Sequence, residues 1–394
     1  MNTAITFKIY RSTSDLPSGW DAVAAPNIFL QSDYLAILQT SCPNNMMCHF
    51  IGLFKSEVLI GVALSQFLNL SDVESFGERD KKLKTTIRQI VFKSMASNVL
   101  VLGNNMLSGQ NAYIFNEEIQ ARDGLALLDE SLSEIKRMLA AKGIKTHLTI
   151  YKDFPFEESE NFTDAIFSKY SKFTTQPSMQ FAIDKKLRSF DDYVARLNKK
   201  YRDQYKRARK KSEDVLKRKL DLHEIIRYNA AIYKLYRTVA ANAPFNTFYL
   251  PEDHFIQFKK CLKDEFLFYG YFIGNELVGF NTLIRNGSDI DTYFLGYNET
   301  CQREKMLYLN MLYDMIGYTI NKGFKEIIFA RTALEIKSSV GAKPVGMFGY
   351  IHHSNKLINA FMPKLFRYFE PETQWKQRHP FKDSEPQPSS ALEG

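Results

Sequence analysis

Apolar and polar positions follow a short-period pattern at two places in the chain. Residues 50–61 read FIGLFKSEVLIG and residues 268–279 read FYGYFIGNELVG, with a polar turn inside each apolar run. Apolar runs of this length that flank a tight turn predict a β-hairpin. Aligned without gaps, the two segments are identical at Phe50/Phe268, Gly52/Gly270, Phe54/Phe272, Leu59/Leu277 and Gly61/Gly279.

A longer apolar period, of three and four residues, follows each hairpin and predicts an amphipathic helix. The apolar positions are Leu125, Leu128, Leu132, Ile135 and Leu139 in the first helix, and Leu307, Met311, Leu312, Met315 and Ile316 in the second. Each helix is predicted to end at a Lys-Gly pair, and similar segments follow, KGIKTHLTI at 142–150 and KGFKEIIFA at 322–330. Two matches in the same order indicate a duplicated hairpin–helix–strand module, which predicts a mixed α/β fold.

The duplication predicts two domains, residues 1–175 and residues 176–372. The final segment, KDSEPQPSSALEG at 382–394, is rich in proline and serine and is predicted to be a disordered tail. The spacing from hairpin to Lys-Gly pair differs by some 38 residues between the copies, so the first copy carries an insertion.

The charge of the chain is concentrated in one element. The net charge is +8, but residues 196–219 hold twelve Lys or Arg and three acids, an excess of +9, so the remainder carries −1. Ser189 and Asp192 have the spacing of a capping box, and the apolar positions after them recur as on a helix, so a basic helix is predicted near the start of the second domain, within 189–219. We expect its basic side chains to project outward: Lys199, Lys200, Arg202, Lys206, Arg207, Arg209, Lys210 and Lys211. Such a cluster attracts an anionic partner, and the alternative is a solvated helix face.

Several functional classes are not expected. The mean hydropathy is −0.29, no apolar run reaches the roughly 18 residues of a membrane helix, and the N-terminus lacks a signal-peptide pattern, so a cytoplasmic location without a transmembrane segment is predicted. Cys42, Cys48, Cys261 and Cys301 have no zinc-site spacing. The side chains of the neighbouring His352 and His353 would point apart on a helix or a strand, so we expect no metal site.

The order of these elements resembles the GNAT acyltransferase fold, and its doubling around a basic helix resembles the Fem-type peptidyltransferases and related Fem-like N-acyltransferases. The segments that carry the resemblance are SFDDYVARLNKKYRDQYKRARKK (189–211), GYNETCQREKMLYLNMLYDMIGYTINKG (296–323) and ARTALEIKSSVGAKP (330–344). The resemblance implies two tandem GNAT-like domains. It also implies an N-acyltransferase that moves an acyl or aminoacyl group onto an amine of a lipid or cell-envelope precursor.

The donor side departs from acetyl-CoA-dependent GNAT proteins. At the position of their glycine-rich phosphate loop, this chain reads QREKML at 302–307, without the glycines that let a phosphate approach the backbone. Fem-type enzymes also lack this cradle, because their donor is an aminoacyl-tRNA. We therefore expect no bound cofactor and a donor that acts as co-substrate: acyl-CoA, acyl-carrier protein or aminoacyl-tRNA.

In this fold the chemistry lies at the ends of the central strands of the catalytic copy. Lys337 is the first candidate, as a stabiliser of the oxyanion or a phosphate ligand. Glu335 and Asp291 are candidate general bases, and each could instead pair with Arg331. Tyr293 could shuttle a proton or pack in the core. No nucleophile elbow or Cys–His pair is suggested, so direct attack by the amine is expected.

Further residues are candidates for binding. Arg331 suits a carboxylate or phosphate clamp, and the other substrate-binding candidates are Lys343, Lys200, Arg202 and Asn246. The donor-docking group on the basic helix is Lys206, Arg207, Arg209 and Lys210. The same helix could make peripheral contact with a membrane. An alternative function is a non-catalytic binding module whose basic helix holds RNA or an acidic carrier protein.

Overall fold

The structure is a computed structural model that describes residues 4–71, 96–242, 246–369 and 375–382. The predicted tail at 382–394 lies outside this range except for its first residue. The N-terminal half holds β1 (Ile5–Tyr10), α1 (Trp20–Ala24), α2 (Ser32–Thr40), β2 (Met46–Lys55), β3 (Val58–Asn69), β4 (Asn98–Leu102), β5 (Tyr113–Phe115), α4 (Ala121–Ala140), β6 (Leu148–Pro155) and α5 (Asp164–Phe167).

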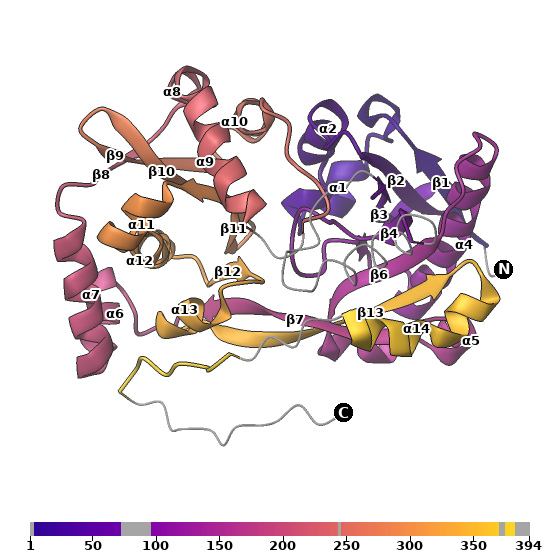
Figure 1. The fold of residues 1–394 in the computed structure, drawn as a ribbon. Helices are drawn as coiled ribbons and strands as arrows, with labels where there is room; N and C mark the ends of the chain where they lie inside the picture. Colours follow the sequence, from indigo (N-terminus) through magenta and orange to yellow (C-terminus); the bar gives the residue numbers. More distant parts are fainter. Residues whose placement is uncertain (1–3, 72–95, 243–245, 370–374, 383–394) are drawn as a thin grey trace, which may run out of the picture.

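The C-terminal half begins with β7 (Ser171–Ala182) and contains most of the helices (Figure 1). Its elements are α6 (Phe190–Arg196), α7 (Lys199–Lys211), β8 (Leu216–Lys219), α8 (Leu222–Arg227), α9 (Asn229–Ala241), α10 (His254–Leu262), β9 (Phe266–Ile273), β10 (Glu276–Asn286), β11 (Asp289–Tyr297), α11 (Glu299–Lys305), α12 (Leu307–Asn321), β12 (Glu326–Ala330), α13 (Leu334–Ser339), β13 (Lys343–His353) and α14 (Lys356–Phe369).

The predicted duplication is confirmed. The two segments that share glycines form the antiparallel hairpins β2–β3 and β9–β10. The two apolar periods form α4 and α12, whose predicted stripes are buried. Each helix leads through a glycine with positive φ, Gly143 or Gly323, into a strand that pairs in parallel with an earlier one, β6 with β4 and β12 with β11. Both copies therefore have the same hairpin–helix–strand connection.

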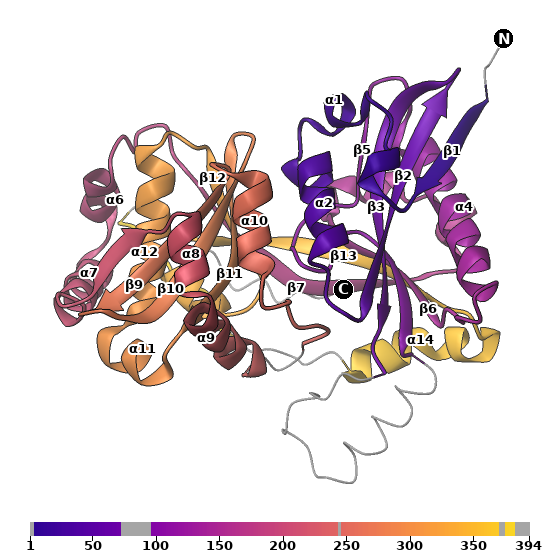
Figure 2. The ribbon, with the colours of Figure 1, turned by 90° about the horizontal axis from the view of Figure 1, so that it is seen from above.

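One mixed sheet joins the two halves. Across the described residues its order is β1-β2-β3-β4-β6-β13-β7-β12-β11-β10-β9-β8, with β5 added beside β3. The expected boundary between residues 175 and 176 falls inside β7, and β13, from the predicted second domain, pairs with both β6 and β7. Figure 2 shows β7 and β13 running from one half to the other. Gly349 of β13 allows this pairing, because a Cβ there would lie 2.4 Å from the backbone oxygen of Tyr151.

The two halves also share a hydrophobic core. One cluster of buried side chains runs from Trp20 and Leu38 in the N-terminal half to Phe258 and Phe280 in the C-terminal half, and α10 packs against α2. Shared strands and a shared core therefore connect the two halves.

The basic segment differs from the single helix that we predicted. Its capping box at Ser189 and Asp192 is confirmed, but the helix breaks at Leu197, and α7 starts from a new cap, Asn198. The break is held by a remote segment, since the Asn198 N–H donates to the Pro380 carbonyl at 2.8 Å. The chain then forms β8 at 216–219 instead of continuing as a helix.

The outward orientation predicted for the basic side chains holds only in part. The exposed residues of this group, which we call the α7 basic face, are Lys199, Lys200, Lys206, Arg207, Lys210 and Lys211. Arg209 corrects the prediction, because its guanidinium turns inward and donates to Asp314 at 2.7 Å and to Asn310 at 3.1 Å. Arg202 is half-buried, with Nη1 3.5 Å from the Leu197 carbonyl.

Candidate active site

A parallel strand pair separates at the middle of each copy. In the C-terminal copy β11 and β12 pair only from Asp289/Glu326 to Asp291/Ile328, and in the N-terminal copy β4 and β6 pair up to Leu102/Tyr151. Two residues beyond each last pair the backbone takes a positive φ, 59° at Ala330 and 64° at Asp153. L-residues rarely adopt this conformation. In the C-terminal copy the pairing of β11 with β12 thus ends at Asp291, and the positive φ at Ala330 follows on β12.

A cavity of about 450 Å³ lies next to this opening, between the two halves. Residues of the N-terminal half on its wall are Pro26, Asn27, Ser108, Gly109, Gln110, Asn111, Pro155 and Glu157; those of the C-terminal half are Gln180, Asn286, Asp291, Ile328, Val345 and Met347. Hydrogen bonds fix the wall, with the Ile28 N–H donating to Asn286 Oδ1 and Asn27 Nδ2 to Asn111 Oδ1, both at 2.9 Å. The cavity is rich in amides and carboxylates, which suits a polar ligand with hydrogen-bond donors.

Asp291 is the buried titratable group on this wall. Its exposed fraction is 4 %, and its Oδ2 accepts from Asn286 Nδ2 at 3.2 Å. Burial raises the pKa of Asp291 from 3.8 to about 7, and the nearby Asp289 and Glu326 add to this shift. A carboxyl group with this pKa is half ionised at neutral pH and can accept a proton from a ligand in the cavity.

Arg331 pairs with neither of the carboxylates considered for it. Its Nη2 donates to Asp153 Oδ2 at 3.0 Å and its Nε to Ser108 Oγ at 3.3 Å, so it links the C-terminal half to the N-terminal half. The ammonium group of Lys152 contacts the same Asp153 oxygen, and burial lowers the pKa of Lys152 to about 8. The guanidinium fork that we expected to clamp a substrate is thus engaged by a carboxylate of the protein.

Lys337 is buried, with 4 % exposure, and not on an exposed loop. Its ammonium group donates to three carbonyls, those of Phe329 at 2.6 Å, Ala330 at 3.3 Å and Arg331 at 2.7 Å. These carbonyls lie at the last two residues of β12 and at the residue that follows it, and burial lowers the pKa of Lys337 to about 7. Since an ammonium group has three hydrogens, all of its donors hold this end of the strand, and none is left for an oxyanion in this conformation.

Glu335 lies on the exposed side of α13, the short helix that also carries Lys337. Its carboxylate forms an ion pair with Arg378, whose Nε donates to Oε1 at 3.0 Å. This pairing holds the pKa of Glu335 below its usual value. A low pKa makes Glu335 a weaker proton acceptor than Asp291 at neutral pH.

Tyr293 follows the packing alternative. Its ring stacks on Phe258 with a centroid distance of 4.7 Å. When the Nδ1–H of His254 donates to the Ser41 carbonyl, its Nε2 accepts from the Tyr293 hydroxyl, at 3.1 and 2.9 Å. Burial raises the pKa of Tyr293 and lowers that of His254 to about 4. Tyr293 lies in the shared core and is not on the wall of the cavity.

The remaining candidates lie at different distances from the cavity. Lys343 is exposed at the start of β13, opposite Gln180, which lines the cavity. Lys200 and Arg202 belong to α7, which both ribbon views place at the far end of the C-terminal half (Figures 1 and 2). Asn246 is half-buried, and its Nδ2 has no hydrogen-bond partner among the described residues. It does not line the cavity.

Sequence reasoning missed the amide side chains around Asp291. Asn286 could have been found, because it precedes the turn that leads into β11 and lies five residues before Asp291. Asn27, Asn111 and Gln180 carry no local signal, since only the fold brings them to the cleft.

The described part of the chain offers neither a metal centre nor a membrane-spanning helix. Within the described ranges, no group of three or more His, Cys, Asp or Glu side chains is arranged to hold a metal ion. None of the helices in these ranges has the length and apolar character needed to cross a bilayer.

Comparisons with known proteins find similarity at the level of structure. No protein-family model and no curated protein sequence matches the chain. Among solved structures, FemX superposes with a TM-score of 0.55 at 11 % identity, covering 90 % of this chain and 99 % of FemX. A tandem GNAT protein from the clavulanic acid biosynthesis pathway gives 0.49 at 8 % identity (89 % and 99 % covered), and L-PGS from Bacillus licheniformis gives 0.45 at 12 % (85 % and 95 %). The similarity to FemX confirms the mixed α/β class and, at the level of the fold, the resemblance to the Fem-type proteins noted from the sequence: this chain has the fold of FemX.

Proposed function

We propose that this protein is an N-acyltransferase that binds an amine acceptor in the cleft between its halves and uses Asp291 as the general base. The observation that carries the proposal is the place of Asp291, a buried carboxyl group with a pKa of about 7 on the wall of a 450 Å³ cavity. The tandem GNAT fold supports acyl transfer as the reaction class by analogy with the acyltransferases that share it.

The chemistry requires that the amine be neutral when it attacks. In the proposed reaction an ammonium group of the acceptor gives one proton to the Asp291 carboxylate. The free amine nitrogen then forms a bond to the carbonyl carbon of the donor. The bond from this carbon to the leaving oxygen or sulfur breaks, the leaving group keeps the electron pair, and the second amine proton passes to it as the amide forms, which gives an alcohol or a thiol. No covalent acyl-enzyme is needed.

The walls of the cavity favour a cationic acceptor. Asp291 and Glu157 are the carboxylates of the lining, which includes no lysine or arginine among the described residues, and the amides of Asn27, Asn111 and Gln180 supply further oxygens and N–H groups. A protonated amine therefore finds acceptors there, and the amides can orient neighbouring hydroxyl or carbonyl groups. An amine on a lipid or cell-envelope precursor agrees with this chemistry.

The donor is proposed to be a large anion that docks on the α7 basic face. Six exposed cations on one helix give a local field that attracts RNA or an acidic carrier protein. Aminoacyl-tRNA and acyl-carrier protein fit this surface better than acyl-CoA, because the glycine-free segment 302–307 forms the end of α11, its αL cap Met306 and the first residue of α12 instead of a phosphate loop.

The proposal is tested by amide formation. The purified protein is incubated with a radiolabelled donor of each class, charged bulk tRNA, acyl-carrier protein or acyl-CoA, and with a panel of amino sugars, lysyl peptides and aminolipids. Treatment with base destroys the ester or thioester donor and leaves an amide product intact. A base-stable product with at least one donor supports the proposal.

Asp291→Asn and Glu157→Gln form the matched pair for this assay, because both remove one carboxylate from the same cavity. The proposed mechanism requires a loss of about 10²–10⁴-fold in rate for Asp291→Asn and a much smaller change for Glu157→Gln. Equal losses in both variants, or full activity of Asp291→Asn, would reject Asp291 as the base. Binding of tRNA or carrier without any amide product favours the non-catalytic binding module instead.

A further inference from the structure

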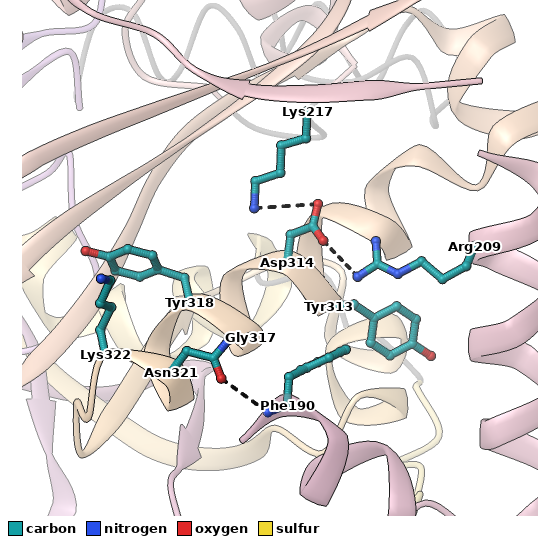
Figure 3. A pocket seen from close by; sticks show the side chains of 9 residues that line it. All are labelled: Phe190, Arg209, Lys217, Tyr313, Asp314, Gly317, Tyr318, Asn321 and Lys322. Atoms are coloured by element: carbon teal, nitrogen blue, oxygen red, sulfur yellow. Dashed lines mark hydrogen bonds and ion pairs between the residues drawn. The ribbon is translucent and has the colours of Figure 1, made fainter. Parts of the chain in front are cut away.

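A second cavity lies in the C-terminal half, on the far side from the cleft beside Asp291. It has a volume of about 340 Å³ and lies between α6, α7, β8 and α12 (Figure 3). Aromatic rings of Phe190, Tyr313 and Tyr318 form part of its wall. The charged side chains on the wall are Arg209, Lys217, Asp314 and Lys322.

Two cations of this cavity share a single carboxylate. Asp314 Oδ1 accepts from Arg209 Nη2 at 2.7 Å, and Asp314 Oδ2 accepts from the Tyr271 hydroxyl at 3.0 Å. Lys217 Nζ lies 3.7 Å from Oδ2, which is beyond hydrogen-bonding distance. Its other close neighbour is the ring of Tyr269, with the centroid at 4.5 Å. The Lys217 ammonium group therefore keeps hydrogens that no acceptor among the described residues takes at short range.

The third cation on the wall of this cavity is Lys322. Lys322 is exposed at the end of α12, and in the part of the chain that the structure describes it makes no ion pair. The adjacent Asn321 uses its Oδ1 to accept from the Phe190 N–H at 3.2 Å, which leaves its amide nitrogen as a donor. Three cations against one carboxylate leave an excess of two positive charges around the cavity, part of it shielded from water.

We propose that this cavity binds a small organic phosphate, with Lys217 and Lys322 as the phosphate ligands. A phosphate monoester carries close to two negative charges at neutral pH, which matches the excess. The volume exceeds that of a phosphate group, and the rings of Phe190 and Tyr318 offer an apolar surface for the organic part. This site does not depend on the proposed transferase activity.

The proposal is tested with phenyl phosphate as the probe, titrated into the full-length protein at low salt and followed by calorimetry, with phenol and inorganic phosphate as comparison ligands. We expect phenyl phosphate to bind, inorganic phosphate to bind more weakly, and phenol not to bind. Lys217→Met and Lys322→Gln should each weaken binding by about tenfold, which is the loss of roughly one charge-assisted contact.

Lys219→Met is the matched control, because Lys219 lies on the same strand as Lys217 but is exposed and does not line the cavity. It should leave the affinity for phenyl phosphate unchanged. Equal weakening by Lys219→Met would show general attraction to a basic surface and overturn the proposal. No binding at about 10 mM probe, well above the millimolar range of a weak site, would also overturn it. Lys322 is exposed, so the Lys322→Gln variant tests the site even if Lys217→Met folds poorly.

Discussion

Asp291→Asn should stabilise the protein at neutral pH while it removes the proposed base. The side chain lies at 4 % exposure and its pKa is raised from 3.8 to about 7 by burial. Between these two pH values the folded state binds more protons than the unfolded state. The free energy of unfolding therefore falls as the pH rises through this window, and the whole cost is present above pH 7.

The size of the effect follows from the shift. One pKa unit corresponds to about 1.4 kcal/mol, so a shift of roughly three units costs the folded protein about 4 kcal/mol at pH 8 and about 1.5 kcal/mol at pH 5. Asparagine has nearly the same shape, carries no charge at any of these pH values, and keeps an oxygen for the Asn286 amide, which donates at 3.2 Å. The variant should gain most of this energy at pH 8 and much less at pH 5.

Urea unfolding of both proteins at pH 5 and pH 8, followed by circular dichroism, measures the difference. Glu157→Gln is the control, since it removes a carboxylate from the same cavity at an exposed position, and it should change stability by less than about 0.5 kcal/mol at either pH. A variant Asp291→Asn that is less stable than the native protein at pH 8, or whose gain does not depend on pH, would refute the assignment of Asp291 as a buried, ionisable group.

Three further predictions concern other parts of the fold. In urea titrations, the stability of the native protein relative to Lys337→Met should rise by about 2 kcal/mol from pH 7 to pH 9. The reason is that burial lowers the pKa of Lys337 to about 7 in the folded state, so the lysine loses its proton at a lower pH there than in the unfolded chain. Parallel pH profiles of the two proteins would contradict this. Gly296→Ala should lower the free energy of unfolding by about 3 kcal/mol in the same assay, because the added Cβ would lie 2.6 Å from the backbone of α9. An unchanged urea midpoint would show that α9 can shift freely. Replacing Lys206, Arg207 and Lys210 by glutamine should make the negative slope of log affinity for tRNA against log salt concentration shallower by about 2. Anisotropy titrations measure this slope, and thermal stability should not change. An unchanged slope would exclude the α7 basic face as the docking surface.

The local elements could be predicted because their signals are local. The hairpins, the two amphipathic helices and the Ser189 capping box are specified by residues within a few positions of one another, and all are confirmed. The break at Leu197 could not be predicted, because it is held by a hydrogen bond to Pro380. The pairing of β13 with β6 likewise depends on a partner far away in the sequence.

For the candidate site, the sequence names residues but does not display their burial or their partners. The fold resemblance makes Asp291 a candidate, because it places the chemistry at the ends of central strands, but the pKa of Asp291 depends on burial that the sequence does not display. The same reasoning makes Lys337 a candidate, but the sequence does not display that its ammonium group is buried and donates to the carbonyls of Phe329 and Arg331. For Arg331 the sequence predicts a substrate clamp, with an ion pair to Glu335 or Asp291 as the alternative, and its partner in the structure is Asp153 from the other half.

The two copies differ in what occupies the end of their parallel strand pairs. Both copies open a parallel strand pair and place a positive φ two residues later, at Asp153 and at Ala330. In the N-terminal copy Lys152 donates to the carbonyls of Asn104 and Leu107 and contacts the carboxylate of Asp153, so charged groups of the protein occupy the opening. In the C-terminal copy the buried Lys337 also donates to backbone carbonyls at the opening. Because Lys337 lies on α13, Asp291 still faces the cavity. Charged groups of the protein therefore occupy the opening in the N-terminal copy, whereas the opening in the C-terminal copy leaves Asp291 available to a ligand.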